Sequence, residues 1–392
     1  MQRRDFLTAM SVAAGAPRLG LAFAPGAHQG KLKISGIEVW RVEGHAETPL
    51  SQLYLTVKTD AGLDGLYGPM DEASLYFLER QFAPRLAGQD PLAVEAIWDR
   101  LFHASDAARG KAFMAGLSAI DNALWDLRGR YFEQPVYSLL GGPTRVAVDV
   151  YAGCQGFSHA PAALRERVQA LARDGFTRQK WFFTRVPADG LDGLAENVAL
   201  ARQVREMLGD DADIMFDCHA GWNLDYAIEW ARQAETFRPR WLEEPFPPEQ
   251  LESFARLRHA TSIPIASGEH LYDRWRVHDY LEAWALNIAQ PDPEWCGGIS
   301  EVVRICAIAS LYDVQVMPHS TNLRAGLHAV ASQSPGVCPL LEYPVAPIQR
   351  RMWFEKNPPR PVAGKIALDA APGFGIELDE TRIERKSRVL AV

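Results

Sequence analysis

The fold of this chain is decided by three short stretches: IMFD at residues 214–217, WLEEP at 241–245 and IASGEH at 265–270. Each is an apolar run that leads into a carboxylate, and the three acids, Asp217, Glu243 and Glu269, follow one another at equal steps of 26 residues. That step matches one strand-loop-helix-loop unit, and strands that alternate with helices predict a parallel sheet. When such a sheet closes into a barrel, acids at the strand ends face one mouth, where active sites lie.

The three acids predict a metal site. Carboxylates gathered at one mouth repel one another unless a cation joins them, and oxygen ligands with room for water favour a hard ion such as Mg²⁺. The alternative is that each acid only caps the helix after its strand. The fixed repeat behind three apolar runs favours a site in which Asp217, Glu243 and Glu269 bind the metal.

The rest of the chain predicts an α/β protein with a (β/α)8-type TIM barrel and a capping domain. Residues 31–143 alternate first at strand spacing and then at helical spacing, which indicates an α+β capping domain. From residue 144 strands and helices alternate, and eight apolar runs up to Glu342 predict a barrel over 144–342. Residues 343–392 are too many for a simple tail, and we expect them to return to the cap.

Composition limits the classes of function. The chain has 392 residues, a net charge of −8 and no basic stripe, which argues against nucleic-acid binding. No apolar run reaches the length of a membrane-spanning helix. The five cysteines lack the spacing of a metal site, and we expect buried free thiols rather than a disulfide framework.

Residues 1–30 resemble a twin-arginine export signal. Arg3 and Arg4 precede a mildly apolar stretch at 7–14, and cleavage after Ala24 or Ala27 is compatible with the small residues there. Such signals carry folded proteins, so we expect a bacterial periplasmic or exported protein. The alternative is a disordered basic tail on a cytoplasmic protein.

Two later strand ends predict a proton-transfer pair. Asp292 and His319 end neighbouring predicted strands, so the carboxylate can hold the imidazole and raise its basicity. Beside a divalent cation, such a pair can remove a proton next to a carboxylate while the metal stabilises the resulting enediolate. A histidine that merely ends a strand is the alternative, and the presence of Asp292 and the three other acids argues against it.

These motifs resemble the mandelate racemase subgroup of the enolase superfamily over about residues 31–380. The resemblance rests on AIDNALWDL at 119–127 and on the strand-end motifs LEEP, SGEH, QPD and PH. GEH, and QPD followed by WCGG at 295–298, are similar to the rhamnonate dehydratase branch in particular. The resemblance implies Mg²⁺ at the three acids, a catalytic dyad of His319 and Asp292, Glu342 near the substrate carboxylate, a small sugar acid as the substrate and a homo-oligomer.

One departure from the family pattern favours a particular reaction. Many members carry Lys-x-Lys at the end of the second strand, with the second lysine as a base, whereas this chain has Lys180, Trp181 and Phe182. Racemisation needs acid and base groups on both faces of the carbon, whereas one histidine-centred pair suits syn elimination. We therefore expect a Mg²⁺-dependent dehydratase that converts a sugar acid to a 2-keto-3-deoxy acid. The alternatives are a racemase, epimerase or cycloisomerase of the same fold, and a non-catalytic exported sugar-acid binding protein.

Further side chains are candidates with more than one interpretation. Lys180 can stabilise the enediolate or merely pair with Glu244. His219, two residues after the first acid of the ladder, can act as a second acid or base or bind a substrate hydroxyl. Weaker candidates for binding the sugar are His270, His45 and Arg185.

Overall fold

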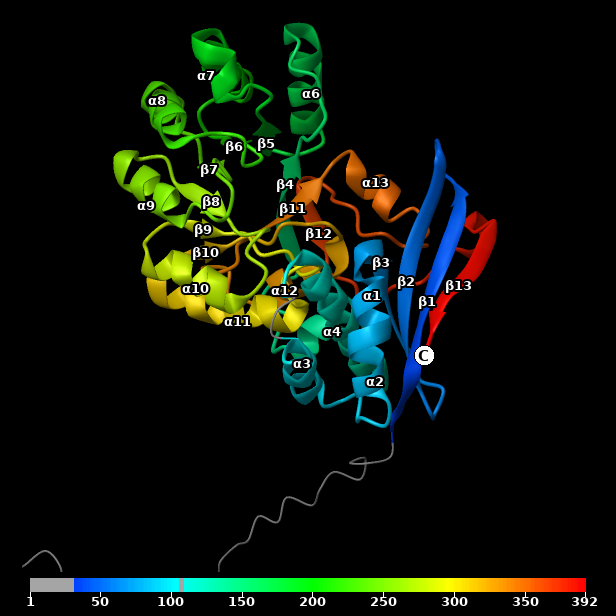
Figure 1. Ribbon diagram of the computed structural model, residues 1–392. Coiled ribbons are helices and arrows are strands. Elements are labelled where there is room, and N and C mark those ends of the chain that lie inside the picture. The colour runs from blue at the N-terminus through cyan, green and yellow to red at the C-terminus, as the bar shows by residue number, and fades with distance from the viewer. Residues whose placement is uncertain (1–31, 106–108) are drawn as a thin grey trace, which may run out of the picture.

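The structure is a computed structural model that describes residues 32–105 and 109–392. The described chain forms a curled parallel sheet ringed by helices and a smaller unit built on an antiparallel sheet (Figure 1). The expected export signal, at residues 1–30, lies outside the described residues. Of the helices that the structure describes, none has both the length and the apolar character needed to cross a membrane.

The smaller unit is the predicted α+β capping domain. Its sheet starts with three antiparallel strands, β1 (Ile34–His45), β2 (Pro49–Thr59) and β3 (Gly65–Met70). Buried and partly exposed side chains alternate along β1, as expected of an antiparallel strand. Its helices are α1 (Leu75–Phe77), which a π-helical segment (Leu78–Phe82) joins to α2 (Ala83–Leu86), α3 (Val94–Phe102), α4 (Lys111–Tyr131) and α5 (Val136–Leu139).

Helix α4 joins the capping domain to the barrel. It is buried along almost its whole length, because β2 and β3 pack on it from the cap and α11 (Ile299–Ala309) packs on it from the barrel. Asp121 accepts hydrogen bonds from the backbone N–H and the hydroxyl of Ser300, at 3.0 and 2.7 Å, and Asn122 donates to the Pro293 carbonyl at 3.1 Å. A buried polar group left without its partner costs about 1–3 kcal/mol, so these bonds fix the cap on the barrel.

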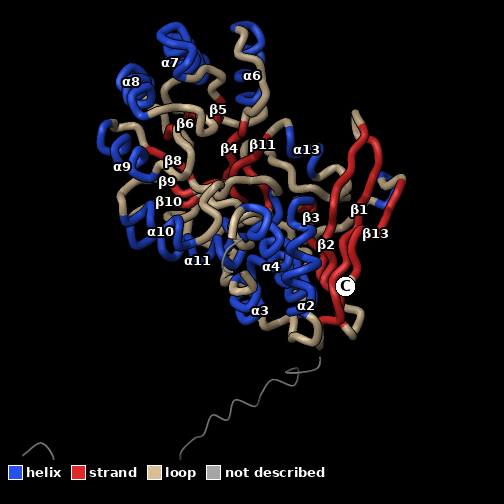
Figure 2. The backbone as a smooth tube through the Cα atoms, in the orientation of Figure 1, coloured by secondary structure: helices blue, strands red, loops and turns tan. Residues whose placement is uncertain are grey.

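Eight parallel strands curl into the barrel, which confirms the predicted fold class (Figure 2). In chain order they are β4 (Ala147–Gly153), β5 (Arg178–Phe182), β6 (Asp213–Asp217), β7 (Trp241–Glu243), β8 (Ile265–Ser267), β9 (Ile288–Ala289), β10 (Gln315–Val316) and β11 (Leu340–Pro344). The hydrogen-bonded order runs from β10 back to β4 and then to β11. At the seam, the Val316 N–H donates to the Val337 carbonyl at 2.8 Å.

The barrel helices pack around this sheet with one apolar face inward. They are α6 (Pro161–Arg173), α7 (Gly190–Leu208), α8 (Leu224–Ala234), α9 (Leu251–Ala260), α10 (Arg274–Glu282), α11 and α12 (Leu323–Ser332). Inside the barrel, the side chains that form one apolar layer are Tyr151, Met215, Trp241, Ala266, Ile288, Met317 and Leu340. This layer fills the interior of the barrel, so the polar groups at the strand ends lie directly above buried apolar side chains.

After the last barrel strand the chain returns to the cap. It passes through α13 (Pro347–Arg351) and β12 (Lys365–Ala367), and then β13 (Arg385–Ala391) pairs antiparallel with β1. All five cysteines are buried free thiols, as predicted.

Candidate active site

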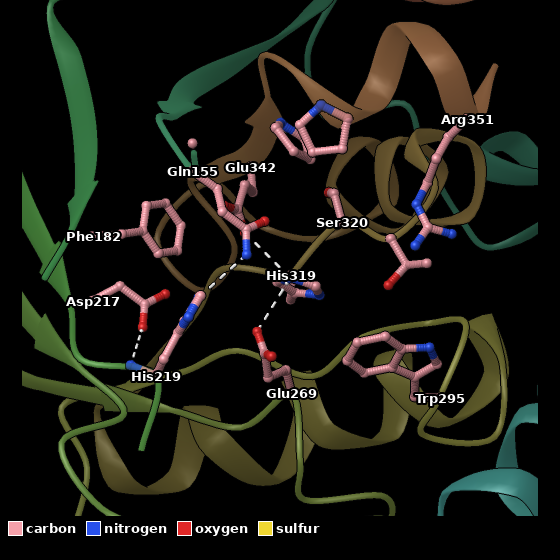
Figure 3. A pocket seen from close by; sticks show the side chains of 14 residues that line it. Gln155, Phe182, Asp217, His219, Glu269, Trp295, His319, Ser320, Glu342 and Arg351 are labelled. Carbon is pink, nitrogen blue, oxygen red and sulfur yellow. Dashed lines mark hydrogen bonds and ion pairs between the residues drawn. The ribbon is translucent and has the colours of Figure 1, made fainter. Parts of the chain in front are cut away.

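Three carboxylates from neighbouring strands lie at the C-terminal mouth of the barrel. Asp217 ends β6 and Glu243 ends β7, and the two residues pair in register, while Glu269 follows β8 by two residues. Asp217 and Glu269 line a cavity of about 170 Å³ at this mouth (Figure 3). The 26-residue step along the chain thus places Asp217 beside Glu243 on paired strands, with Glu269 just beyond the end of the next strand.

Lys180, from β5, is a buried cation among these acids. Its Nζ contacts the Glu243 carboxylate and lies 3.3 Å from Asp217 Oδ2 and 3.1 Å from Glu342 Oε1. Burial alone would lower the pKa of Lys180, but Glu243 and Glu342 outweigh it and hold the pKa well above its ordinary value. Lys180 is therefore charged. The predicted alternative, a pair with Glu244, is wrong because Glu244 points away toward a histidine.

The protonation of the three acids is shifted by their surroundings. Burial raises the pKa of Asp217 to about 6, of Glu243 to about 8 and of Glu269 to about 7, and repulsion between neighbouring carboxylates adds to it. The attraction of Lys180 offsets this only in part. Burial and mutual repulsion thus oppose the charged form of all three acids.

A divalent cation fits this set of groups. All three donors are carboxylate oxygens, the ligands that Mg²⁺ prefers, and the Lys180 ammonium shows that positive charge is stable there. The ion would be held by Asp217 and Glu269, which line the cavity, and by Glu243, whose Oε1 contacts Lys180 and whose Oε2 accepts hydrogen bonds from Trp241 and Gln290. Its charge would remove the repulsion that keeps their pKa values high.

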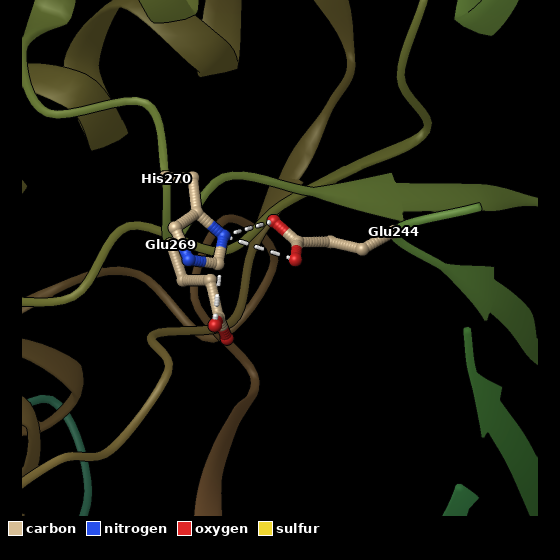
Figure 4. A group of neighbouring side chains, drawn as sticks. All are labelled: Glu244, Glu269 and His270. Atoms are coloured by element: carbon tan, nitrogen blue, oxygen red, sulfur yellow. Dashed lines mark hydrogen bonds and ion pairs between the residues drawn. The ribbon is translucent and has the colours of Figure 1, made fainter. Parts of the chain in front are cut away.

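A second group of possible ligands lies beside the first. In the described part of the chain, one trio of ligand-type side chains has donor atoms within 4.8 Å of one another, namely Glu244, Glu269 and His270 (Figure 4). His270 Nδ1 is 3.0 Å from both Glu244 oxygens, and the hydrogen bond with Glu244 raises the pKa of His270. In this trio Glu244 and His270 are thus bonded to each other, with Glu269 beside them.

His319 and Asp292 form the second half of the site. They lie three residues beyond β10 and β9, because the strands end before Pro318 and Pro291 and are shorter than predicted. His319 Nδ1 is 2.6 Å from Asp292 Oδ2, which also accepts the Thr321 hydroxyl and backbone N–H. Burial would lower the pKa of His319, but Glu269, Asp292 and Glu342 raise it to about 10. Asp292 thus orients the imidazole, and Glu269, whose Oε2 lies 3.1 Å from His319 Nε2, contributes most to the rise in the pKa.

Glu342 and His219 line the same cavity. Within the described residues, Oε2 of Glu342 is buried without a hydrogen-bond partner, and it lies 3.9 Å from His319 Nε2. The His219 backbone N–H donates to Asp217 Oδ1 at 2.9 Å, and its ring packs edge-on against Phe182. Burial lowers the pKa of His219, so its ring is neutral at pH 7 and can donate or accept a proton.

The weaker candidates are not brought to this cavity. His45 Nδ1 bonds the Glu384 carboxylate at 2.9 Å on the surface of the cap. Arg185 pairs with Glu196 at 2.7 Å and lines a separate cavity near α7. His270 lies behind Glu269 and bonds Glu244 instead.

Four further side chains of the cavity, those of Thr321, Trp295, Gln155 and Arg351, were not predicted as site residues. Thr321 and Trp295 lie within three residues of His319 and Asp292, so the motifs around those two residues point close to them. Gln155 follows β4 in a loop without a motif, and Arg351 comes from the C-terminal segment. Only the folded chain brings these last two to the barrel mouth.

Comparison with known proteins assigns the family. Residues 45–141 match the model "Mandelate racemase / muconate lactonizing enzyme, N-terminal domain", and residues 163–382 match "Enolase C-terminal domain-like". The chain belongs to the mandelate racemase and muconate lactonizing enzyme family of the enolase superfamily. This confirms the resemblance inferred from the strand-end motifs.

Relatives within this enolase-superfamily family include sugar-acid dehydratases. The chain is 32% identical to an L-rhamnonate dehydratase of Saccharopolyspora erythraea, over 84% of each chain, and 30% identical to a D-galactonate dehydratase of Ralstonia nicotianae, over 91% of this chain and 95% of the relative. These relatives are named as dehydratases, which are hydro-lyases.

Solved structures of similar fold include a 3,6-anhydro-D-galactonate cycloisomerase of Zobellia galactanivorans, with 27% identity, a TM-score of 0.78 and coverage of 90% of this chain and 100% of that one. A mandelate racemase/muconate lactonizing protein of Paracoccus denitrificans, complexed with magnesium, has 28% identity and a TM-score of 0.81. That comparison covers 91% of this chain and 99% of the other. A magnesium complex therefore exists in a structural neighbour.

Proposed function

We propose that this member of the enolase superfamily is a Mg²⁺-dependent sugar-acid dehydratase that yields a 2-keto-3-deoxy acid. The observation that carries the proposal is the His319–Asp292 pair, which faces the carboxylate-lined cavity into which Phe182 brings no second base. The rhamnonate and galactonate dehydratases among its relatives support the proposal.

The reaction follows from the positions of the site residues. When bound, Mg²⁺ would neutralise the substrate carboxylate and the negative charge that develops as the α-proton leaves. In its neutral form, His319 takes this proton at Nε2, while Asp292 holds Nδ1 and stabilises the imidazolium that results. The C–H electrons form the C=C bond, the bond from the β-carbon to its hydroxyl breaks, and the same Nε2 proton leaves with that oxygen as water. The enol product then tautomerises to the 2-keto acid.

Two polar groups have supporting roles in this scheme. Lys180 keeps its positive charge among the acids and so stabilises negative charge on the enediolate. The unpartnered Oε2 of Glu342 accepts a hydrogen bond from the substrate. His219 binds a substrate hydroxyl or serves as a second acid, and a His219→Gln variant separates the two: the first role raises KM, and the second lowers kcat.

An isomerase of the same fold is the second candidate. The structural similarity to a cycloisomerase favours it, because that enzyme shares the same barrel and cap arrangement over 90% of this chain. The absence of a lysine at position 182 favours dehydration, since racemisation and epimerisation need proton transfer at both faces of the carbon.

A product assay decides between the candidates. The enzyme is incubated with Mg²⁺ and a panel of aldonic and aldaric acids in D₂O, and 2-keto-3-deoxy acids and α-deuterium exchange are followed by NMR. We expect a keto acid from at least one panel member. Deuterium exchange without any keto acid would identify an isomerase. If an acid binds but gives neither exchange nor keto acid, the protein is a binding protein.

We also propose that residues 1–30 direct export and that the enzyme is a homo-oligomer. The paired Arg3 and Arg4 support the first proposal. Fusing residues 1–30 to a reporter and changing both arginines to lysine should abolish transport, and light scattering on the purified enzyme should give a multiple of the chain mass.

A further inference from the structure

A second cavity, of about 300 Å³, adjoins the central one between the cap and the barrel mouth. The two cavities share Trp295, Thr321 and Arg351 in their walls. The central cavity alone, at about 170 Å³, is smaller than most ligand pockets, which measure about 300–1,000 Å³. The shared wall residues place the side cavity where the far end of a substrate that reacts at His319 would lie.

Two cations face this side cavity from opposite parts of the chain. Lys111 begins α4 of the cap, and its Nζ lies 3.7 Å from the centre of the Trp295 ring. Arg351 ends α13, and its guanidinium lies near Trp295 and Ser320 in the view of the central cavity (Figure 3). No ion pair within 4 Å includes Lys111 or Arg351 across residues 32–105 and 109–392, although Arg351 attracts the Glu294 carboxylate at longer range. Both are available to an anion in the cavity.

Both acids of the side cavity form hydrogen bonds with other groups. Glu294 accepts the Tyr67 hydroxyl at 2.5 Å, and burial together with the nearby Asp292 raises the pKa of Glu294 well above its ordinary value, although Arg351 lowers it. Asp71 is engaged with the backbone N–H of Ala73 at 2.9 Å. Glu294 and Asp71 thus hold hydrogen-bond donors of the protein, whereas Lys111 and Arg351 face the side cavity next to a central cavity lined by acids.

We propose that Arg351 and Lys111 bind a carboxylate at the far end of the substrate, so that the enzyme prefers a dicarboxylic sugar acid to the matching monocarboxylic one. The inference deepens the proposed function, from which it takes the substrate class. A guanidinium binds a carboxylate through two parallel hydrogen bonds, and an ammonium adds a point charge. A terminal phosphate could use the same cations, but its second negative charge would face Asp71 and the acids of the central cavity.

Matched substrate pairs test the inference. The pairs are galactonate and galactarate, gluconate and glucarate, and mannonate and mannarate, which differ within each pair only at carbon six. Dissociation constants are measured calorimetrically with Mg²⁺ on the His319→Asn enzyme, and kcat/KM is measured on the wild type. We expect at least one diacid to be favoured by tenfold or more, which corresponds to about 1.4 kcal/mol.

Variants of the two cations assign the preference to them. Arg351→Gln and Lys111→Met should each reduce the preference for the diacid, measured as the ratio of its kcat/KM to that of the monoacid, by about tenfold. The matched control is Arg350→Gln, because the neighbouring Arg350 side chain bonds Thr48 and the Pro49 carbonyl on the cap. That variant should retain the wild-type ratio. Melting temperatures of all three variants exclude a loss of folding as the cause.

The failures of the two proposals are distinguishable. Equal or weaker binding of every diacid, or no binding by any diacid, overturns the inference and leaves the dehydratase proposal to its own assay. Diacid selectivity that depends on Arg351, without any keto-acid product, supports the anion site and contradicts the dehydratase. Tighter binding of 6-phosphogluconate than of glucarate would overturn the choice of a carboxylate.

Discussion

Phe182 determines how many groups can exchange protons with a bound substrate. It ends β5, next to the buried Lys180, and its ring lines the cavity. A phenyl ring can neither give nor take a proton, whereas His319 lines the same cavity as a base oriented by Asp292. In the proposed mechanism, removal of the α-proton therefore depends on His319, and His219 is the other imidazole that lines the cavity.

Replacing His319 by Asn should remove catalysis but keep the metal site. A positioned acid–base group contributes about 10²–10⁴-fold to the rate, so we expect kcat to fall by at least that range. The matched control is His278→Asn on α10, where the histidine lies outside the cavity. Steady-state kinetics on a substrate from the product assay measure the effect, and an unchanged kcat in His319→Asn would rule out the mechanism.

Mg²⁺ should stabilise the enzyme through Asp217. A ligand that binds only the folded state stabilises it by about 2.7 kcal/mol at 100 times its dissociation constant, so the melting temperature should rise with Mg²⁺ and fall with EDTA. Asp217→Asn should lose most of this rise. Asp213→Asn is the control, because Asp213 begins the same strand and pairs with Arg240. An equal Mg²⁺ response in the two variants would contradict the ligand assignment.

Helix α12 shows how one element carries polar groups through the core. All ten of its residues, Leu323–Ser332, are buried, including Arg324 and His328. His328 Nδ1 accepts the backbone N–H of Tyr137 at 3.1 Å, which ties α12 to α5 of the cap. Burial, with the charge of Arg324, lowers the pKa of His328 to about 3. The helix is thus stable only while this imidazole stays neutral.

The buried His328 should make stability depend on pH. Its folded pKa lies below the unfolded value of 6.5, so its contribution is present above pH 6.5 and is lost as the pH falls. Between pH 7 and pH 5 this loss amounts to about 2 kcal/mol. Urea unfolding should show it in the wild type and not in His328→Asn, whose amide oxygen can still accept the Tyr137 N–H. Equal losses in both proteins would refute the assignment.

The whole molecule is held together by the return of the C-terminal segment. The Arg324 guanidinium donates two hydrogen bonds to Glu355 Oε2, at 2.8 and 2.6 Å, and others to the carbonyls of Asn357 and Phe374. These contacts connect the barrel to the segment that ends in β13 of the cap sheet. The cap and the barrel mouth are therefore stabilised by one buried ion pair as well as by α4.

Removing one partner of this ion pair should lower the free energy of unfolding more than replacing both partners by apolar residues. Arg324→Met leaves Glu355 buried without its partner, and loss of one partner of a buried pair destabilises a protein by about 3–5 kcal/mol. The double variant Arg324→Met/Glu355→Met should recover much of this, because it leaves no uncompensated charge. Urea midpoints of the three proteins measure the difference. A double variant no more stable than Arg324→Met would show that packing, rather than charge, holds the segment.

Much of the architecture followed from local pattern. The alternation of strands and helices predicts the barrel, and the 26-residue step predicts that Asp217, Glu243 and Glu269 share one mouth, since parallel strands all end on the same side. The proximity of Asp292 and His319 follows in the same way. The strand lengths did not follow, because Pro291 and Pro318 end two predicted strands early.

By itself, then, the sequence determined the fold class, the family and the ladder of acids, because these depend on spacing along the chain. The contacts between side chains from different elements were decided only by the tertiary structure. It paired Lys180 with Glu243 rather than Glu244, since only the first of these adjacent acids points into the barrel. It also brought Arg351 from the C-terminal segment to the cavity, a contact between distant segments that no local pattern encodes.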